Sequence, residues 1–88
     1  MFIRDFQWDS GNEDHIAKHA VRREEAEEAC LQARTFLRSR LGRYAAYGQT
    51  EAGRYLVVIF IPLGQGLIRV ISARDMEFRE RRWLRKRL

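Results

Sequence analysis

Basic side chains are concentrated near the end of this sequence, where six arginine or lysine residues lie between Arg79 and Arg87. A guanidinium group donates hydrogen bonds from a planar fork that matches phosphate oxygens, and fixed arginines stabilise charge that develops during phosphate chemistry. The predicted phosphate ligands in this segment are Arg81, Arg82, Arg85 and Lys86. The acidic Glu80 is expected to form an ion pair that orients one of the arginines.

Three further arginines border or interrupt apolar segments and are candidates for the same chemistry. Arg54 precedes the apolar run 55–61, and Arg69 and Arg74 lie in the segment IRVISARD. Strict alternation along a strand places Arg69 on the face opposite to Arg74. Arg69 then shares a face with apolar neighbours. Two interpretations are possible: Arg69 binds phosphate, or it pairs with a glutamate of a helix.

The two histidines, His15 and His19, are four residues apart on a predicted helix. This spacing is found in zinc-binding helices, but the segment HIAKH lacks the glutamate of a metalloprotease helix and has no evident third ligand. We therefore expect no metal site and no cofactor. His15 is expected to be structural, and His19 is a candidate for proton transfer at neutral pH.

Composition narrows the class of protein. The chain has 88 residues and a net charge of +5, which predicts a single domain spanning 1–88. Residues 1–33 carry a net charge of −4 and residues 34–88 a net charge of +9, and a basic surface favours a polyanionic partner. The sequence has no long apolar run and only one cysteine, Cys30. These features predict a cytoplasmic protein without a membrane span.

The order of hydrophobic patterns predicts an α+β fold. We expect a strand near 2–8, a helix capped by Asn12 and a second helix over 23–33. A mostly antiparallel sheet of four to five strands follows, with strands opening near Phe36 and over 43–50, 55–61 and 67–73. Asp75 is expected to cap a final helix over 76–86, in which Trp83 either anchors the core or stacks on a base.

Four segments of this sequence resemble the BrnT family of bacterial type II toxins, within the wider group of RelE/ParE-like toxins. They are WDSGNEDHIAKHAV, EEAEEA, GQTEAGRYLVVIF and IRVISARDMEFRERR, in family order and spacing. Two positions depart from the family pattern. Ala20 stands where glycine is usual after the histidine, and Leu84 stands where an aromatic residue is common.

The resemblance implies a RelE-like fold and a small, metal-independent endoribonuclease that inhibits translation. It also implies a BrnA-like antitoxin that neutralises the toxin and provides the only contact with operon DNA. RNA cleavage requires that the phosphate is bound, that its added negative charge is stabilised and that protons are transferred. The catalytic candidates for these tasks are His19, Arg69, Arg74 and Glu80. Arg54 is a further candidate phosphate ligand. Two alternatives stay open, a nucleic-acid-binding module without chemistry and a domain whose basic groove receives only an acidic protein partner.

Overall fold

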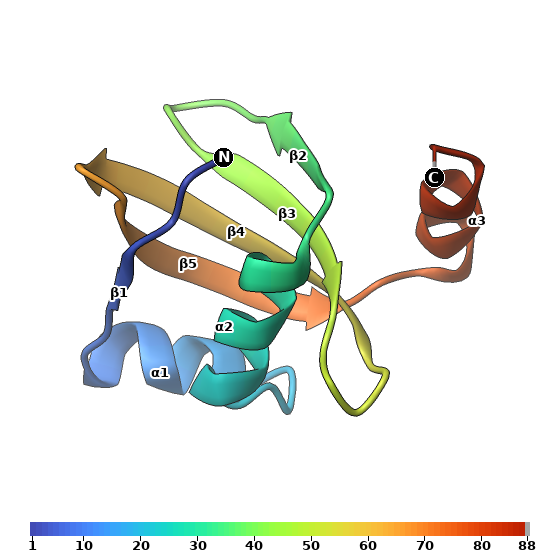
Figure 1. Cartoon of the computed structure of the whole chain (residues 1–88). Helices are drawn as coiled ribbons and strands as arrows, with labels where there is room; N and C mark the ends of the chain where they lie inside the picture. The colour runs from blue at the N-terminus through green and yellow to red at the C-terminus, as the bar shows by residue number, and fades with distance from the viewer. Residues whose placement is uncertain (88) are drawn as a thin grey trace.

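The computed structural model describes residues 1–87 and contains a five-stranded sheet with three helices (Figure 1). The elements follow one another as β1 (Asp5–Gln7), α1 (Ser10–Ala17), α2 (Arg23–Gln32), β2 (Thr35–Arg38), β3 (Tyr44–Gln49), β4 (Tyr55–Gly64), β5 (Leu67–Asp75) and α3 (Phe78–Arg87). The strand order is β1-β5-β4-β3-β2, with β1 parallel to β5 and every other pair antiparallel. The predicted α+β class is thus confirmed. Within residues 1–87, no helix has the length and apolarity needed to cross a membrane.

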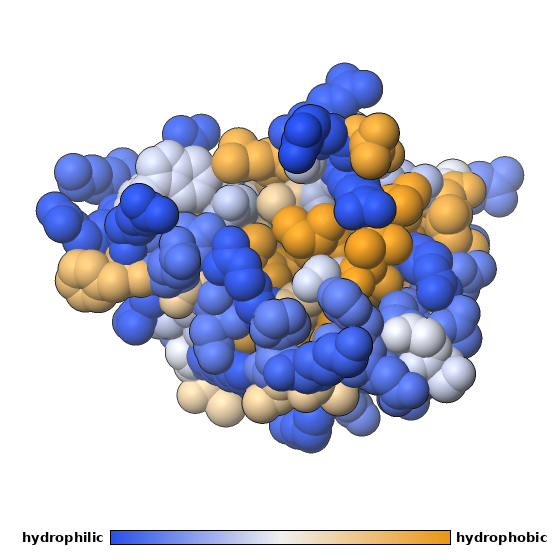
Figure 2. Space-filling view, turned by 180° about the vertical axis from the view of Figure 1, so that it is seen from behind, coloured by the Kyte–Doolittle hydropathy of each residue, from blue (hydrophilic) through white to orange (hydrophobic). Residues whose placement is uncertain are grey.

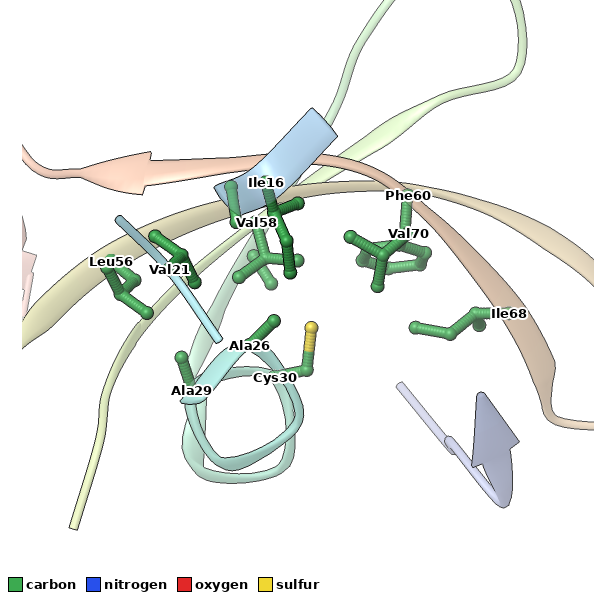
Figure 3. Close-up of a cluster of buried hydrophobic side chains, with 12 residues drawn as sticks. Ile16, Val21, Ala26, Ala29, Cys30, Leu56, Val58, Phe60, Ile68 and Val70 are labelled. Carbon is green, nitrogen blue, oxygen red and sulfur yellow. The ribbon is translucent and has the colours of Figure 1, made fainter. Parts of the chain in front are cut away.

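Helices α1 and α2 cover one face of the sheet and enclose the larger hydrophobic core (Figure 3). Small side chains on α2, among them Ala26, Ala29 and Cys30, let the helix lie close to β3 and β4. The approach is closest at Gly48, where an added Cβ atom would lie 1.9 Å from the carbonyl oxygen of Ala29. Glycine is therefore required at this position of β3 by backbone proximity rather than by its dihedral angles.

Helix α1 begins at a different cap from the one that the sequence predicts. Asp9 is the N-cap and accepts a hydrogen bond from the backbone of Asn12, whose side chain bonds back to Asp9 N–H. The prediction of Asn12 as the cap was wrong, because Asn12 lies inside the helix and is buried. Its side-chain amide donates to the carbonyl oxygens of Gln7 and Val70, both at 3.0 Å. Asn12 thus joins α1 to two strands, β1 and β5.

The end of α1 closes through a residue in the left-handed conformation. Ala20 has φ 57°, and its N–H donates to the carbonyl oxygen of Ala17, while Val21 N–H donates to that of Ile16. These two bonds define a Schellman motif, which favours glycine at the left-handed position. Ile16 and Val21 are both buried. Packing of these two side chains holds the turn in place although alanine occupies the glycine position.

A β-bulge in β5 determines which face each of its side chains occupies. Ile59 pairs with Ser72 but Phe60 pairs with Val70, so Ile71 has no partner in β4. The extra residue shifts the alternation by one position. Arg69, opposite Ile61, and Arg74, opposite Val57, therefore share a face of the sheet. The prediction that they point in opposite directions was wrong, because strict alternation does not continue through a bulge.

Helix α3 packs on this second face and covers only one end of it. Leu84 and Met76 are buried there against Val57 and Ala45, and Trp83 packs beside them. The helix begins at Phe78, two residues later than predicted. Asp75 does not cap the helix. It is the last residue of β5.

The remainder of the second face carries apolar side chains that α3 does not cover. Leu37, Ile59 and Ile61 lie on neighbouring strands there; Leu37 is exposed, and Ile59 and Ile61 are half-buried. We call this surface the open sheet face. Figure 2 shows hydrophobic side chains gathered on this side of the molecule, bordered by hydrophilic residues. On the α1–α2 side of the sheet, by contrast, Val58, Phe60 and Val70 are completely buried.

Candidate active site

Arg74 and Glu80 form a two-point ion pair where β5 gives way to α3. The Arg74 Nη1 and Nη2 atoms donate to the two Glu80 carboxylate oxygens at 2.7 and 2.9 Å. Glu80 also accepts a hydrogen bond from Glu77 N–H, which fixes the carboxylate at the start of α3. The Arg74 guanidinium lowers the pKa of the Glu80 carboxyl group. Glu80 thus forms an ion pair with an arginine, as the sequence predicted.

Tyr47 of β3 lies next to this ion pair, between two hollows in the surface. One hollow is lined by Tyr47, Glu80, Trp83 and Leu37. The Tyr47 and Trp83 rings meet edge to face, with centroids 5.1 Å apart. Burial and then the nearby Glu80 carboxylate raise the pKa of the Tyr47 phenol. The phenol therefore keeps its proton at neutral pH, so it can donate a hydrogen bond or a proton.

The second hollow is a pocket of about 410 Å³ between α3, the last residues of β3 and the α2–β2 connection. Aromatic groups from Tyr47 and Tyr55 line it, together with the guanidinium groups of Arg34, Arg81 and Arg85. Within residues 1–87, no carboxylate forms a salt bridge with any of these three arginines. The pocket thus combines aromatic surface with positive charge, as single-stranded nucleic-acid sites do.

Arg81 is held at the wall of this pocket by an aromatic ring. Its guanidinium carbon lies 4.3 Å from the centroid of the Tyr55 ring, which is a cation–π distance. Among the other predicted phosphate ligands on α3, Arg85 also lines the pocket, whereas Arg82 and Lys86 are exposed and do not line it. The structure therefore brings two of the four α3 candidates together and leaves the other two on the outer surface of the helix.

Arg54 is occupied by bonds to three separate segments of the protein. Its side chain donates to both Asp75 carboxylate oxygens, at 2.7 and 3.2 Å, and to Glu25 at 3.1 Å. It also donates to the backbone oxygens of Ala20 and His19 at the end of α1. Asp75 raises the pKa of the guanidinium and is the largest cause of the shift. These contacts leave Arg54 as a crosslink between α1, α2 and β5.

Arg69 and His19 do not join Arg74 and Glu80. Arg69 donates to both carboxylate oxygens of Asp9, at 2.9 and 3.2 Å, near the opposite end of β5 from Arg74. His19 lies at the end of α1, on the α1–α2 side of the sheet, and neither hollow beside α3 is lined by a histidine. The four predicted catalytic residues therefore form one pair, Arg74 with Glu80, and two separate positions.

Sequence reasoning missed Tyr47, Tyr55 and Arg34 as residues of the site. The two tyrosines belong to segments that indicated only strands, now β3 and β4. They lie in the pocket that Leu84 also lines, so β3 and β4 provide aromatic groups where α3 carries none at position 84. Arg34 follows α2 directly and had no pattern that connected it with α3.

The remaining reactive groups lie outside this region. Cys30 is buried, and burial raises the pKa of its thiol to about 12, so the thiol stays protonated. Within residues 1–87, the structure contains no group of three or more histidine, cysteine, aspartate or glutamate residues arranged to hold a metal ion. The chemistry available beside α3 is therefore that of arginine, glutamate and tyrosine.

Comparison with known proteins agrees with this fold. Residues 8–80 match the family described as the ribonuclease toxin, BrnT, of type II toxin–antitoxin systems. The crystal structure of the Brucella abortus ribonuclease toxin, BrnT, is similar with a TM-score of 0.69 and 28% sequence identity, over 83% of this chain and 96% of that one. Comparison with curated sequences gave no match. The chain belongs to the BrnT family of ribonuclease toxins of type II toxin–antitoxin systems.

Proposed function

We propose that this protein is a metal-independent endoribonuclease that cleaves single-stranded RNA and thereby inhibits translation. The observation that carries the proposal is the Arg74–Glu80 pair beside Tyr47, next to a pocket with three arginines that form no salt bridge with a carboxylate of residues 1–87. Membership of a ribonuclease toxin family supports the reaction class. Action on translation places the protein in the cytoplasm.

The proposed reaction needs no protein nucleophile. The 2′-hydroxyl oxygen of the RNA attacks the adjacent phosphorus, and the bond from phosphorus to the 5′-oxygen breaks. The products are a 2′,3′-cyclic phosphate and a 5′-hydroxyl group. Arg74 binds the phosphate and stabilises its added negative charge, because Glu80 holds the guanidinium in place before substrate arrives.

Two protons move in this reaction. The 2′-hydroxyl proton leaves to solvent, and Tyr47 donates its phenolic proton to the departing 5′-oxygen, then regains one from water. An alkoxide is a much stronger base than a phenolate, so the transfer to the 5′-oxygen is favourable. Burial keeps Tyr47 protonated before the reaction, as its raised pKa indicates. Arg81 and Arg85 hold neighbouring phosphates of the strand.

This assignment changes the roles of three residues that the sequence nominated. Arg54 and Arg69 become positioning residues, because Arg54 bonds to the α1 and α2 segments and Arg69 lies at the other end of β5 from Tyr47. Their side chains are also less exposed than that of Arg74, at 25% and 28% against 42%. His19 contributes its backbone oxygen to Arg54 and lies apart from Arg74. Arg82 and Lys86 remain as a general attraction for RNA, which is sensitive to salt.

The test is cleavage of a labelled single-stranded RNA by the purified protein in the presence and absence of EDTA. We expect equal rates in both conditions, with products that end in a 2′,3′-cyclic phosphate and begin with a 5′-hydroxyl. Loss of activity in EDTA would contradict metal independence. Salt-sensitive RNA binding without cleavage would instead support the non-catalytic alternative.

The second part of the proposal concerns the antitoxin. A BrnA-like antitoxin covers the open sheet face through a segment with apolar and acidic side chains, since Leu37, Ile59 and Ile61 lie beside the basic helix α3. Such a segment also blocks access to Arg74, which shares this face of the sheet. Any contact with operon DNA is made by the antitoxin.

A further inference from the structure

The pocket between α3 and β3 contains a glutamine whose side chain is held in one orientation. The Gln49 Nε2 atom donates to the carbonyl oxygen of Gly53 at 3.1 Å, across the turn between β3 and β4. The Gln49 Oε1 atom is thereby left as an acceptor on a fixed side chain. A second glutamine, Gln32, lines the same pocket from the end of α2. Two amide groups therefore accompany the aromatic and cationic groups already described.

Amide groups are suited to reading the hydrogen-bonding edge of a nucleobase, whereas arginines bind the phosphate that every nucleotide shares. Of the two amides, that of Gln49 is oriented by its bond to Gly53. The pocket, of about 410 Å³, has the size of a small-ligand site. Tyr47 and Tyr55 supply aromatic surface against which a base can pack. Phosphate ligands, stacking groups and amide groups are thus within one hollow.

We infer that this pocket binds a single unpaired nucleotide next to the cleaved bond, and that Gln49 selects its base. This inference rests on the proposed ribonuclease function and adds a specificity-determining residue to it. The phosphate lies against Arg34, Arg81 or Arg85, and the base packs on the tyrosines with its edge toward Gln49. Tyr47 also borders the hollow that Glu80 lines, and Glu80 binds Arg74, so the bound nucleotide lies beside the proposed site of cleavage.

The binding test uses RNA that the protein cannot cleave. Tetranucleotides of each base with 2′-O-methyl groups lack the attacking hydroxyl, and their binding is followed by NMR shifts of backbone amides. We expect saturable shifts at residues of the pocket, with one base preferred over the other three. Absence of saturable shifts there, up to the solubility limit of all four probes, would overturn the inference.

The matched variants are Gln49→Ala and Gln65→Ala, because Gln65 is an exposed glutamine in the turn between β4 and β5, outside the pocket. We expect Gln49→Ala to weaken binding of the preferred tetranucleotide by roughly three- to tenfold, as for loss of one hydrogen bond, and to reduce the preference between bases. Gln65→Ala leaves both unchanged. Equal affinity and equal preference in Gln49→Ala and the unmodified protein would refute the role of Gln49.

Sequencing of cleavage products then separates this inference from the proposed function. If the unmodified protein cleaves RNA with a base preference that Gln49→Ala relaxes, both stand. If it cleaves with a preference that Gln49→Ala does not change, only the base-selecting role fails. If it binds the tetranucleotides in the pocket but cleaves no RNA, the catalytic proposal fails and the nucleotide site remains.

Discussion

Arg74 and Glu80 meet through two parallel hydrogen bonds, of 2.7 and 2.9 Å, that connect the last strand of the sheet to the last helix. The pair has two consequences. It presents a positioned guanidinium on the face of the sheet that carries the pocket, and it fixes the start of α3 through the bond from Glu77 N–H to Glu80. In the proposed mechanism, activity and the attachment of α3 therefore depend on the same two side chains.

Replacement of Arg74 by alanine is expected to lower the rate of RNA cleavage by roughly 100-fold, the usual cost of losing a preorganised charge donor. Cleavage of labelled RNA under single-turnover conditions measures the effect. Arg23→Ala is the control, since Arg23 is an exposed arginine of α2 that contacts Glu13 only weakly, at 3.8 Å. Full activity in a folded Arg74→Ala protein would remove Arg74 from the mechanism.

Arg69→Ala is expected to reduce thermal stability but to leave the cleavage rate close to that of the unmodified protein. The physical reason is that Arg69 binds the Asp9 carboxylate, which caps α1, and lies at the other end of β5 from Arg74. Thermal unfolding and single-turnover cleavage are measured on the same sample. A large loss of cleavage without a change in melting temperature would restore Arg69 as a catalytic residue.

Acid is expected to loosen α3 before the sheet unfolds. The pKa of Glu80 is lowered from 4.5 in the folded protein, so its stabilising effect is complete above pH 4.5 and is lost as the pH falls through the folded pKa. Fluorescence of Trp83 reports the change, because Trp83 packs on Tyr47. The measurement uses a Trp8→Phe background to remove the other tryptophan.

Other carboxyl groups with lowered pKa values, including those of Asp75 and Glu25, titrate in the same range. The control for the acid experiment is therefore Glu80→Gln in the Trp8→Phe background. We expect the acid-induced change in Trp83 emission to disappear in this variant. An unchanged transition would show that Glu80 does not hold α3.

Ala20→Gly is expected to stabilise the protein by about 1 kcal/mol, because alanine at φ 57° carries a steric cost that glycine lacks. For a domain of this size such a gain raises the melting temperature by roughly 4–8 °C. Ala17→Gly, at the last residue of α1, is the matched control and should destabilise the protein by up to about 1 kcal/mol. The prediction fails if both substitutions change the melting temperature in the same direction.

Ile61→Glu is expected to weaken binding of the antitoxin by at least about tenfold, because it places a charge on the open sheet face beside the proposed apolar contact. Isothermal titration with the purified antitoxin measures the affinity. Leu31→Glu is the control, since Leu31 is 60% exposed on α2, an element of the opposite face. Equal affinities for the two variants would place the antitoxin elsewhere.

Much of the fold follows from local patterns that the sequence shows directly. The apolar run from Tyr55 to Ile61 predicted the central strand, and the spacing of Ala26, Ala29 and Cys30 predicted the buried face of α2. The pairing of Glu80 with an arginine was also predictable, because Glu80 is surrounded by basic residues. In each case the information lies within a few residues of the feature.

The errors arose where contacts between distant segments decide the outcome. Asn12 is a favourable cap residue, but its buried amide is required by carbonyl groups of Gln7 and Val70. Arg54 was predicted to bind phosphate, because the sequence does not indicate that Asp75 and Glu25 bind its guanidinium group. Tyr47 joined the site only through the docking of α3. None of these contacts has a local pattern in the sequence.

Because of the bulge at Ile71, the number of residues in β5, rather than the identity of the residue at position 71, determines the direction in which Arg74 points. Deletion of this single residue restores regular pairing between β4 and β5, and either Arg69 or Arg74 must then turn toward the α1–α2 core. A substitution at Ile71 leaves the number of residues, and hence the direction of both arginines, unchanged. Insertions and deletions in β5 are therefore the changes that would separate Arg74 from Glu80 or Arg69 from Asp9, even where every arginine is retained.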